Sequence, residues 1–201
     1  MKKVLMIAFA LLVAGKVSAQ GPSIGIKGGL SFSNIIETDD SDFKTDYNTG
    51  YNAGVFVNIP IISVLSFQPE LMFAQKGYKS DVALGTFTQT TNWIEVPILA
   101  KISPVAGFSI YAGPQVSFLT KTKNKYEGDF TTTEQTKYED DADKFKKSIV
   151  GGVLGAGFNL SQNISLNARY ALDFQKNNED GTEETPEFKN QTWQAGLAFK
   201  F

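Results

Sequence analysis

The sequence ends with Trp193-Gln194-Ala195-Gly196-Leu197-Ala198-Phe199-Lys200-Phe201, the stretch from which we predict the fold. Every second residue counted back from Phe201 is apolar, and the residues between them are polar or small. This alternation predicts a β-strand with one apolar face. A soluble protein would gain little from two phenylalanines and a tryptophan at a chain end that frays. A transmembrane barrel needs such residues, because its last strand must pair with its first and aromatic side chains mark both membrane interfaces.

The first nineteen residues have the pattern of a signal peptide. Two lysines follow Met1, residues 4–15 form an apolar run, and Val17-Ser18-Ala19 supplies small residues for cleavage. The apolar run is too short to cross a bilayer as a helix, which takes ~20 residues. We therefore predict a signal peptide over 1–19, followed by an outer-membrane β-barrel domain over 20–201.

Composition excludes several classes of protein. The chain has 19 basic and 21 acidic residues, and loss of the predicted signal peptide removes three lysines, which leaves 16 against 21 and a net charge of −5. This acidic balance predicts no nucleic-acid partner. No later segment approaches 18 continuous apolar residues, so a membrane-embedded mature chain has to cross the bilayer with strands.

Eight alternating segments follow the predicted signal peptide, joined in turn by long polar and very short connections. We place the segments at 23–34, 50–59, 64–78, 91–102, 108–120, 148–160, 164–175 and 193–201, and the long connections at 35–49, 79–90, 121–147 and 176–189. Segments of about ten to twelve residues at ~3.3 Å each, tilted by ~40°, cover roughly the 25 Å apolar band of an outer-membrane barrel. A soluble lipocalin-like barrel also alternates, but it is polar outside, whereas the polar faces here carry charges that fit only a wet or paired lumen. We therefore predict an all-β, eight-stranded antiparallel up-and-down transmembrane β-barrel.

Charge in the connections gives the barrel a predicted orientation. Connection 35–49 has a net charge of −4 and connection 176–189 of −3, whereas the three short turns carry no charge. We place the acidic connections at the cell exterior, where an extracellular ligand could bind them. Asp39-Asp40-Ser41-Asp42 and Glu179-Asp180-Gly181 offer hard oxygen ligands for Ca²⁺. Neither has an EF-hand pattern, and acidic rims are also ordinary solvated surface, so we predict no metal site.

The predicted inward face gathers seven charged residues. They are Lys27, Glu70, Glu95, Lys101, Arg169, Asp173 and Lys200. Four cations and three anions in a narrow lumen are expected to pair, because desolvation penalises an isolated buried charge. Two roles stay open for them: a salt-bridged plug that fills the barrel, or the lining of a narrow pathway. An eight-stranded barrel has room for side chains and little else, which favours the plug.

Catalytic chemistry has little support in this sequence. The chain has no His and no Cys, so the usual activation of a nucleophile and most transition-metal sites are missing. Glu70 with Glu95 is the remaining candidate for acid–base chemistry, but Lys101 or Arg169 is a better neighbour for either carboxylate. We predict no catalytic residue, no enzyme activity and no cofactor.

Large aromatic residues are expected to form the interfacial girdles and to contact lipid. We assign to this group Tyr51, Phe73, Trp93, Phe108, Phe118, Tyr170, Trp193 and Phe201. Phe201, preceded by Phe199, also resembles the signal by which the barrel-assembly machinery recognises its substrates. The predicted partners are therefore that machinery during biogenesis and, afterwards, outer-membrane lipid and lipopolysaccharide.

Four strings in the middle of the chain carry a family resemblance. They are FQPELMFAQKG at 67–77, WIEVPILAK at 93–101, YAGP at 111–114 and GAGF at 155–158, and Ala168-Arg169-Tyr170 and the terminal aromatic residue fit with them. Together they resemble the outer-membrane β-barrel domain family of Bacteroidetes, often labelled PorT-like or "porin family". The resemblance spans nearly the whole mature chain and implies an eight-stranded outer-membrane barrel. It implies no defined activity.

These observations predict a protein of the bacterial outer membrane with a structural or surface-interaction role. It would have a charged luminal plug and long acidic extracellular loops. The alternative is a narrow porin-like channel for ions or small solutes.

Overall fold

The computed structural model describes residues 21–37, 45–82, 85–128, 132–138, 148–176 and 188–201, and within these ranges every regular element is a β-strand. The strands are β1 Ser23–Glu37, β2 Asp46–Ile62, β3 Leu65–Val82, β4 Gly85–Val105, β5 Phe108–Gly128, β6 Thr132–Tyr138, β7 Ser148–Asn159, β8 Ile164–Asp173 and β9 Phe188–Lys200. Within the described ranges no helix has the length and hydropathy needed to cross a membrane. The predicted signal peptide over 1–19 and the acidic strings 39–42 and 179–181 lie outside the described residues.

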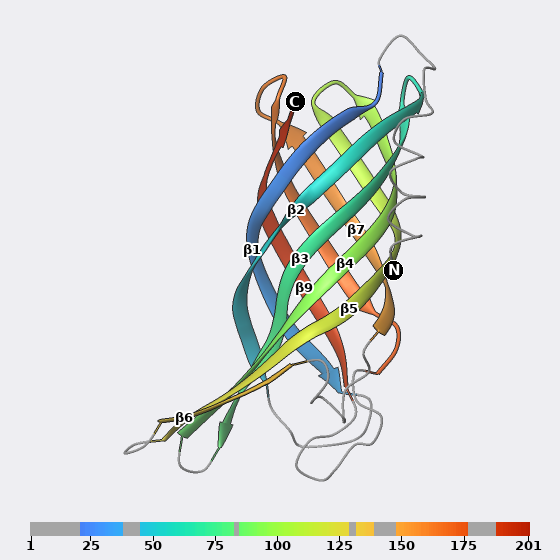
Figure 1. Ribbon diagram of the computed structural model, residues 1–201. Coiled ribbons are helices and arrows are strands. Elements are labelled where there is room, and N and C mark those ends of the chain that lie inside the picture. The colour runs from blue at the N-terminus through green and yellow to red at the C-terminus, as the bar shows by residue number, and fades with distance from the viewer. Residues whose placement is uncertain (1–20, 38–44, 83–84, 129–131, 139–147, 177–187) are drawn as a thin grey trace.

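Eight of the strands close into an antiparallel ring (Figure 1). The ring runs β1-β2-β3-β4-β5-β7-β8-β9, and β9 returns to pair with β1 from Gly25↔Lys200 to Glu37↔Phe188. Closure matters because an open sheet would present unpaired backbone groups along its edges. The predicted fold class, an eight-stranded antiparallel barrel closed by the C-terminal strand, is confirmed.

Glycine lines the seam where the last strand meets the first. Gly29 pairs with Gly196, and a Cβ on Gly29 would lie 2.1 Å from the carbonyl oxygen of Ala195. A Cβ on Gly196 would lie 2.2 Å from the carbonyl oxygen of Gly28. Only a residue without a side chain permits this close approach of the two backbones.

The outward face of the ring is a belt of apolar side chains. Thirty large apolar side chains of the described residues are exposed, and Leu154 reaches 63%. The belt continues across strands, since Ile26 lies between Val55 on β2 and Phe199 on β9. Soluble monomers rarely expose apolar patches of more than a few hundred Å². A belt around the whole ring is instead suited to the hydrocarbon of a bilayer.

The three predicted short turns join β2 to β3, β4 to β5 and β7 to β8, all at the end of the barrel where the C-terminus lies (Figure 1). At the other end, all four connections that we predicted as polar loops are shortened by strand residues, and two of them are mostly strand. Most of 79–90 belongs to β3 and β4, which pair as far as Val82↔Gly85. Most of 121–138 belongs to β5 and β6, which pair from Lys121↔Tyr138 to Glu127↔Thr132. Both stretches are rich in threonine, which favours strands, and each has a neighbouring strand to pair with.

The extended parts of β3, β4, β5 and β6 form a four-stranded projecting sheet. It comprises residues 77–82, 85–92, 121–128 and 132–138, and it leans away from the barrel axis (Figure 1). β6 pairs with β5 where β7 no longer does, because β7 pairs with β5 only up to Phe118↔Ser148. The described residues therefore include a ninth strand, β6, that does not belong to the ring.

Candidate functional site

Six charged side chains from four strands meet inside the barrel and form what we call the luminal network. They are Lys27 on β1, Glu70 and Lys76 on β3, Glu95 on β4, and Arg169 and Asp173 on β8. Each stands at a position of its strand that alternates with the outward apolar residues, so the period of two directs all six inward. Three cations and three anions leave the network neutral.

One half of the network joins β1, β3 and β8. The Nζ atom of Lys27 lies 2.5 Å from the Glu70 carboxylate, and Nη1 of Arg169 lies 3.0 Å from Oε2 of the same residue. Gln68 donates a hydrogen bond of 2.7 Å to Oε1 of Glu70. Arg169 also donates from Nε to the side-chain oxygen of Gln194. Glu70 is therefore held by two cations and an amide, which compensates for its desolvation.

The other half joins β3, β4 and β8. Nη2 of Arg169 lies 3.6 Å from Glu95, and Nζ of Lys76 lies 3.0 Å from both Glu95 and Asp173. Lys76 is only 1% exposed, which makes it one of the largest fully buried side chains among the described residues. The sequence prediction missed Lys76 because the third segment was followed inward only as far as Ala74. The same alternation, continued by one step, reaches Lys76.

Aromatic rings stand beside both lysines of the network. Lys27 Nζ lies 5.9 Å from the ring centroid of Tyr111, and Lys76 Nζ lies 5.4 Å from the centroid of Trp93, in cation–π range. Trp93 donates from Nε1 to Thr91 at 2.8 Å. The prediction that Trp93 faces lipid is wrong: it is 1% exposed, because it alternates with the outward residue Ile94.

Apolar clusters fill the lumen around the network. Trp93, Leu119 and Ile149 form one cluster, and Leu99, Tyr111, Val153 and Ala171 form another. A third cluster, Ile35, Tyr78 and Phe188, lies toward the end of the barrel opposite the turns, with Phe87 packed against it. A space beside Lys27 and Arg169 measures about 20 Å³. Such a space admits roughly one water molecule.

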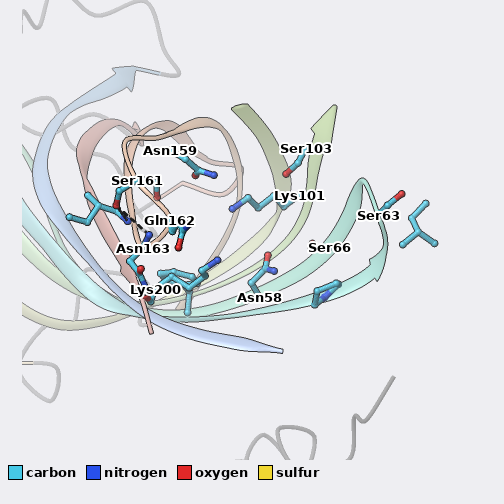
Figure 2. A pocket seen from close by; sticks show the side chains of 15 residues that line it. Asn58, Ser63, Ser66, Lys101, Ser103, Asn159, Ser161, Gln162, Asn163 and Lys200 are labelled. Atoms are coloured by element: carbon cyan, nitrogen blue, oxygen red, sulfur yellow. Dashed lines mark hydrogen bonds between the residues drawn. The ribbon is translucent and has the colours of Figure 1, made fainter. Parts of the chain in front are cut away.

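Lys101 and Lys200 do not join the luminal network. Neither forms an ion pair with a described residue, and both line a cavity at the turn end of the barrel (Figure 2). The prediction that all seven inward charges pair is therefore wrong for these two. Their alternation places them on the inward face, but β4 and β9 carry them to the rim, away from the carboxylates at mid-barrel.

Glu70 and Glu95 do not form an isolated acid–base pair. Both form an ion pair with Arg169, and each has a lysine as a second partner. In the part of the chain that is described, no three His, Cys, Asp or Glu side chains gather as they would around a metal ion.

The two terminal phenylalanines lie on the outer surface at the turn end. Their ring centroids are 5.2 Å apart, and Phe201 is 68% exposed. The backbone N–H of Phe201 donates to the carbonyl of Ile24 at 2.9 Å, which extends the pairing with β1 to the last residue.

On the projecting sheet, the charged pairs are exposed. Lys123 lies 3.0 Å from Glu134, with the two side chains 41% and 48% exposed, and Lys125 lies 2.6 Å from Glu127. The hydrogen bond from Lys125 to Glu127 raises the pKa of the lysine above its ordinary value. Solvent screens such pairs, so they add little stability.

Comparison with known proteins agrees with this geometry. Residues 18–179 match the family described as "Outer membrane protein beta-barrel domain". Among solved structures, Ail, the attachment invasion locus protein of Yersinia pestis, is 16% identical over 90% of this chain and 100% of its own, with a TM-score of 0.54. Neisserial surface protein A is 14% identical over 90% of this chain and 100% of its own, with a TM-score of 0.53. A structure of Ail in complex with the heparin analogue sucrose octasulfate has a TM-score of 0.52 and 16% identity, again over 90% of this chain and 100% of its own. No curated protein matches the chain.

Proposed function

Because the chain belongs to the outer membrane protein beta-barrel domain family and is a small barrel of the bacterial outer membrane, we propose that it has a structural and surface-interaction role and neither conducts nor catalyses. The observation that supports this is the filled lumen. Three buried cations and three buried anions join opposite walls of the barrel, with apolar clusters around them. A hydrated pathway would have to break these contacts, and each broken contact would leave a buried charge unpaired.

Conductance tests this proposal and its alternative, the narrow porin-like channel. The mature chain, refolded and inserted into a planar bilayer, is expected to give no sustained unitary conductance in 1 M KCl. A uniform, long-lived conductance would contradict the proposal. If conductance is seen, Arg169→Ala should change its size or selectivity, because Arg169 bridges Glu70 and Glu95 at the centre of the lumen. Heat-modifiable migration on gels confirms beforehand that each sample is folded.

The surface at which the chain would act is the projecting sheet. Lys121, Lys123 and Lys125 alternate along β5 directly beyond Phe118, the last outward apolar residue of that strand. Their cross-strand partners Asn92, Thr90 and Thr88 share the face of the outward residue Ile94, so the lysines continue the lipid-facing side. The sheet leans away from the barrel axis (Figure 1). We infer that this lean turns the lysine face toward the membrane surface.

Lipopolysaccharide in the outer leaflet is the partner that this geometry favours. Its phosphates lie at the level of the membrane surface, and lysines just outside an apolar belt are placed to contact them. The heparin analogue bound by Ail is also a polyanion. The acidic connections at 35–49 and 176–189, which the sequence predicts as an extracellular binding surface, lie largely outside the described residues.

Thermal unfolding in nanodiscs tests this partner. Lipopolysaccharide is expected to stabilise the wild-type barrel relative to phosphatidylcholine alone, since a ligand that binds only the folded state raises its stability. The triple change of Lys121, Lys123 and Lys125 to Gln should remove most of that increment. Glu127→Gln with Glu134→Gln is the matched control, because it alters the same sheet but removes negative charge, and it should keep or enlarge the increment. An equal increment in the wild type and the triple variant would refute this partner.

Three narrower assignments belong to the same proposal. Residues 1–19 would direct export as a signal peptide. Phe199 and Phe201 would present the assembly signal to the barrel-assembly machinery. The strings at 67–77 and 93–101 support the narrower resemblance to PorT-like barrels of Bacteroidetes.

A further inference from the structure

A polar cavity opens at the turn end of the barrel, and we call it the vestibule. Its volume is about 430 Å³, within the size range of small-molecule sites. Residues from β2 and β3 line one side, Lys101 and Ser103 of β4 another, and the β7–β8 turn with Lys200 of β9 the rest. A second cavity of about 410 Å³ shares Lys101, Ser103 and Asn159 with it. In the outer-membrane orientation argued above, the vestibule opens to the periplasm.

The charge of the vestibule is positive and unbalanced. Lys101 and Lys200 are its two charged residues, and no Asp or Glu is among the residues that line it. Both lysines line this one cavity, and Glu70, the carboxylate of the luminal network whose charge reaches Lys101, already binds Lys27 and Arg169. Two positive charges brought together at a rim without a counter-charge favour a bound anion.

Polar side chains also surround the two lysines. Figure 2 shows Lys101 and Asn58 extending into the space that the β7–β8 turn faces. The side-chain oxygen of Asn58 is buried, and it has no hydrogen-bond partner among the described residues. That oxygen is a hydrogen-bond acceptor and gives no favourable contact to an ionised phosphate oxygen, so the attraction for an anion comes from the two lysines.

The turn that faces these residues is held in place. Ser161 accepts hydrogen bonds from the backbone N–H groups of Asn163 and Ile164, at 3.3 Å and 3.1 Å. The side-chain amide of Asn163 donates a hydrogen bond of 2.6 Å to the backbone carbonyl of Lys200, which ties the turn to β9. The wall of the vestibule is therefore formed before a ligand arrives, which lowers the entropic cost of binding.

We propose that the vestibule binds a phosphate group presented from the periplasmic side. Its two lysines match the two negative charges of a phosphate monoester. Lysine acts as a compact point charge that suits phosphate, whereas planar carboxylates are better recognised by the fork of an arginine, and no arginine lines the vestibule. The same phosphate chemistry could come from a free phosphorylated solute or from a phospholipid headgroup of the inner leaflet.

Titration calorimetry of the refolded mature chain in a maltoside detergent, which carries no phosphate, tests the proposal. The probes are inorganic phosphate, glycerol 3-phosphate and dihexanoyl phosphatidylglycerol, at low salt. We expect saturable binding that is at least about tenfold weaker in Lys101→Gln and in Lys200→Gln, as loss of one charged hydrogen bond implies. Lys189→Gln, on the same strand as Lys200 but at the opposite end of the barrel, is the matched control and should bind within about twofold of wild type. Heat-modifiable migration verifies that each variant is folded.

Each outcome of the titration decides something. Binding of inorganic phosphate and glycerol 3-phosphate that both lysine variants weaken supports a solute site. Binding of the short-chain lipid alone, weakened in the same variants, supports a headgroup site. Absence of saturable binding for all three probes, or binding that both lysine variants retain, would overturn the proposal. Because the vestibule is separate from the luminal network, a conducting barrel would contradict the proposed function and leave this test intact.

Discussion

Loss of Arg169 should destabilise the barrel more than loss of a charge on the projecting sheet. Its guanidinium lies 3.0 Å from Glu70 and 3.6 Å from Glu95, and all three side chains are at most 4% exposed. At an effective dielectric constant of ~20, each contact contributes about 5 kcal/mol before desolvation is subtracted. Removing one partner of a buried pair also leaves the other uncompensated. We therefore expect Arg169→Met to lower the free energy of unfolding by about 3–5 kcal/mol.

Urea unfolding in lipid vesicles measures this change, with heat-modifiable migration and tryptophan fluorescence as two independent readouts. Lys123→Met is the matched control. Lys123 lies 3.0 Å from Glu134, the same separation as between Arg169 and Glu70, but these side chains are 41% and 48% exposed. Its loss is expected to cost less than ~1 kcal/mol. The difference between the two variants compares a buried charge with several partners and an exposed charge with one.

A second change separates electrostatics from packing. Arg169→Met leaves two cations and three anions in the luminal network, whereas Arg169→Met with Glu95→Gln leaves two of each. If unpaired charge is the cause, the double variant should be more stable than the sum of the two single changes predicts. A loss below ~1 kcal/mol for Arg169→Met, or strict additivity in the double variant, would refute the reasoning.

Three further predictions follow from the packing. Gly155→Ala should lower the free energy of unfolding by about 1–3 kcal/mol, because the new Cβ would lie 2.4 Å from the ring of Tyr111. The control Gly21→Ala, whose Cβ would have no atom within 4 Å, should change the free energy of unfolding little. In two variants that each keep a single tryptophan, brominated lipids should quench the fluorescence of Trp193, which is 52% exposed, and leave that of Trp93, which is 1% exposed, largely unchanged. Equal quenching would contradict the inward placement of Trp93. Deletion of Phe201 should reduce the heat-modifiable form recovered in outer membranes, and recovery at the wild-type level would remove it from the assembly signal.

Trp93 and Lys76 both follow the period of two of their strands, although the sequence predictions placed one wrongly and left out the other. Trp93 was assigned to lipid by its residue type, although its odd position in a strand whose outward residues are even predicts an inward side chain. Lys76 was omitted because the inward residues of segment 64–78 were followed only as far as Ala74, although Lys76 shares the parity of Glu70. In both strands the side chains alternate between the lumen and the outer surface without interruption, so this alternation predicts the inward side that the structure shows for both residues.

The extended strands could not be predicted in this way. Residues 79–90 and 121–138 are polar on both faces, so they lack the apolar alternation that marks the membrane-crossing segments. They become strands because each has a partner beyond the membrane: β3 pairs with β4, and β5 with β6. Strand formation there depends on hydrogen bonds across the sheet more than on any pattern within one strand.

The sequence by itself determined the compartment, the antiparallel barrel and the face of most residues, because hydrophobic alternation and a terminal aromatic strand are local properties of the chain. Only the tertiary structure decided which inward charges meet. Lys76 and Asp173 are 97 residues apart, and whether they touch depends on how far each strand slides past its neighbours around the closed ring. The same stagger carries Lys200, the polar alternate between Phe199 and Phe201, away from Glu70, Glu95 and Asp173 and places it beside Lys101 at the rim. Alternation gives a side chain its face, whereas the stagger of the closed barrel gives it its height and therefore its partners.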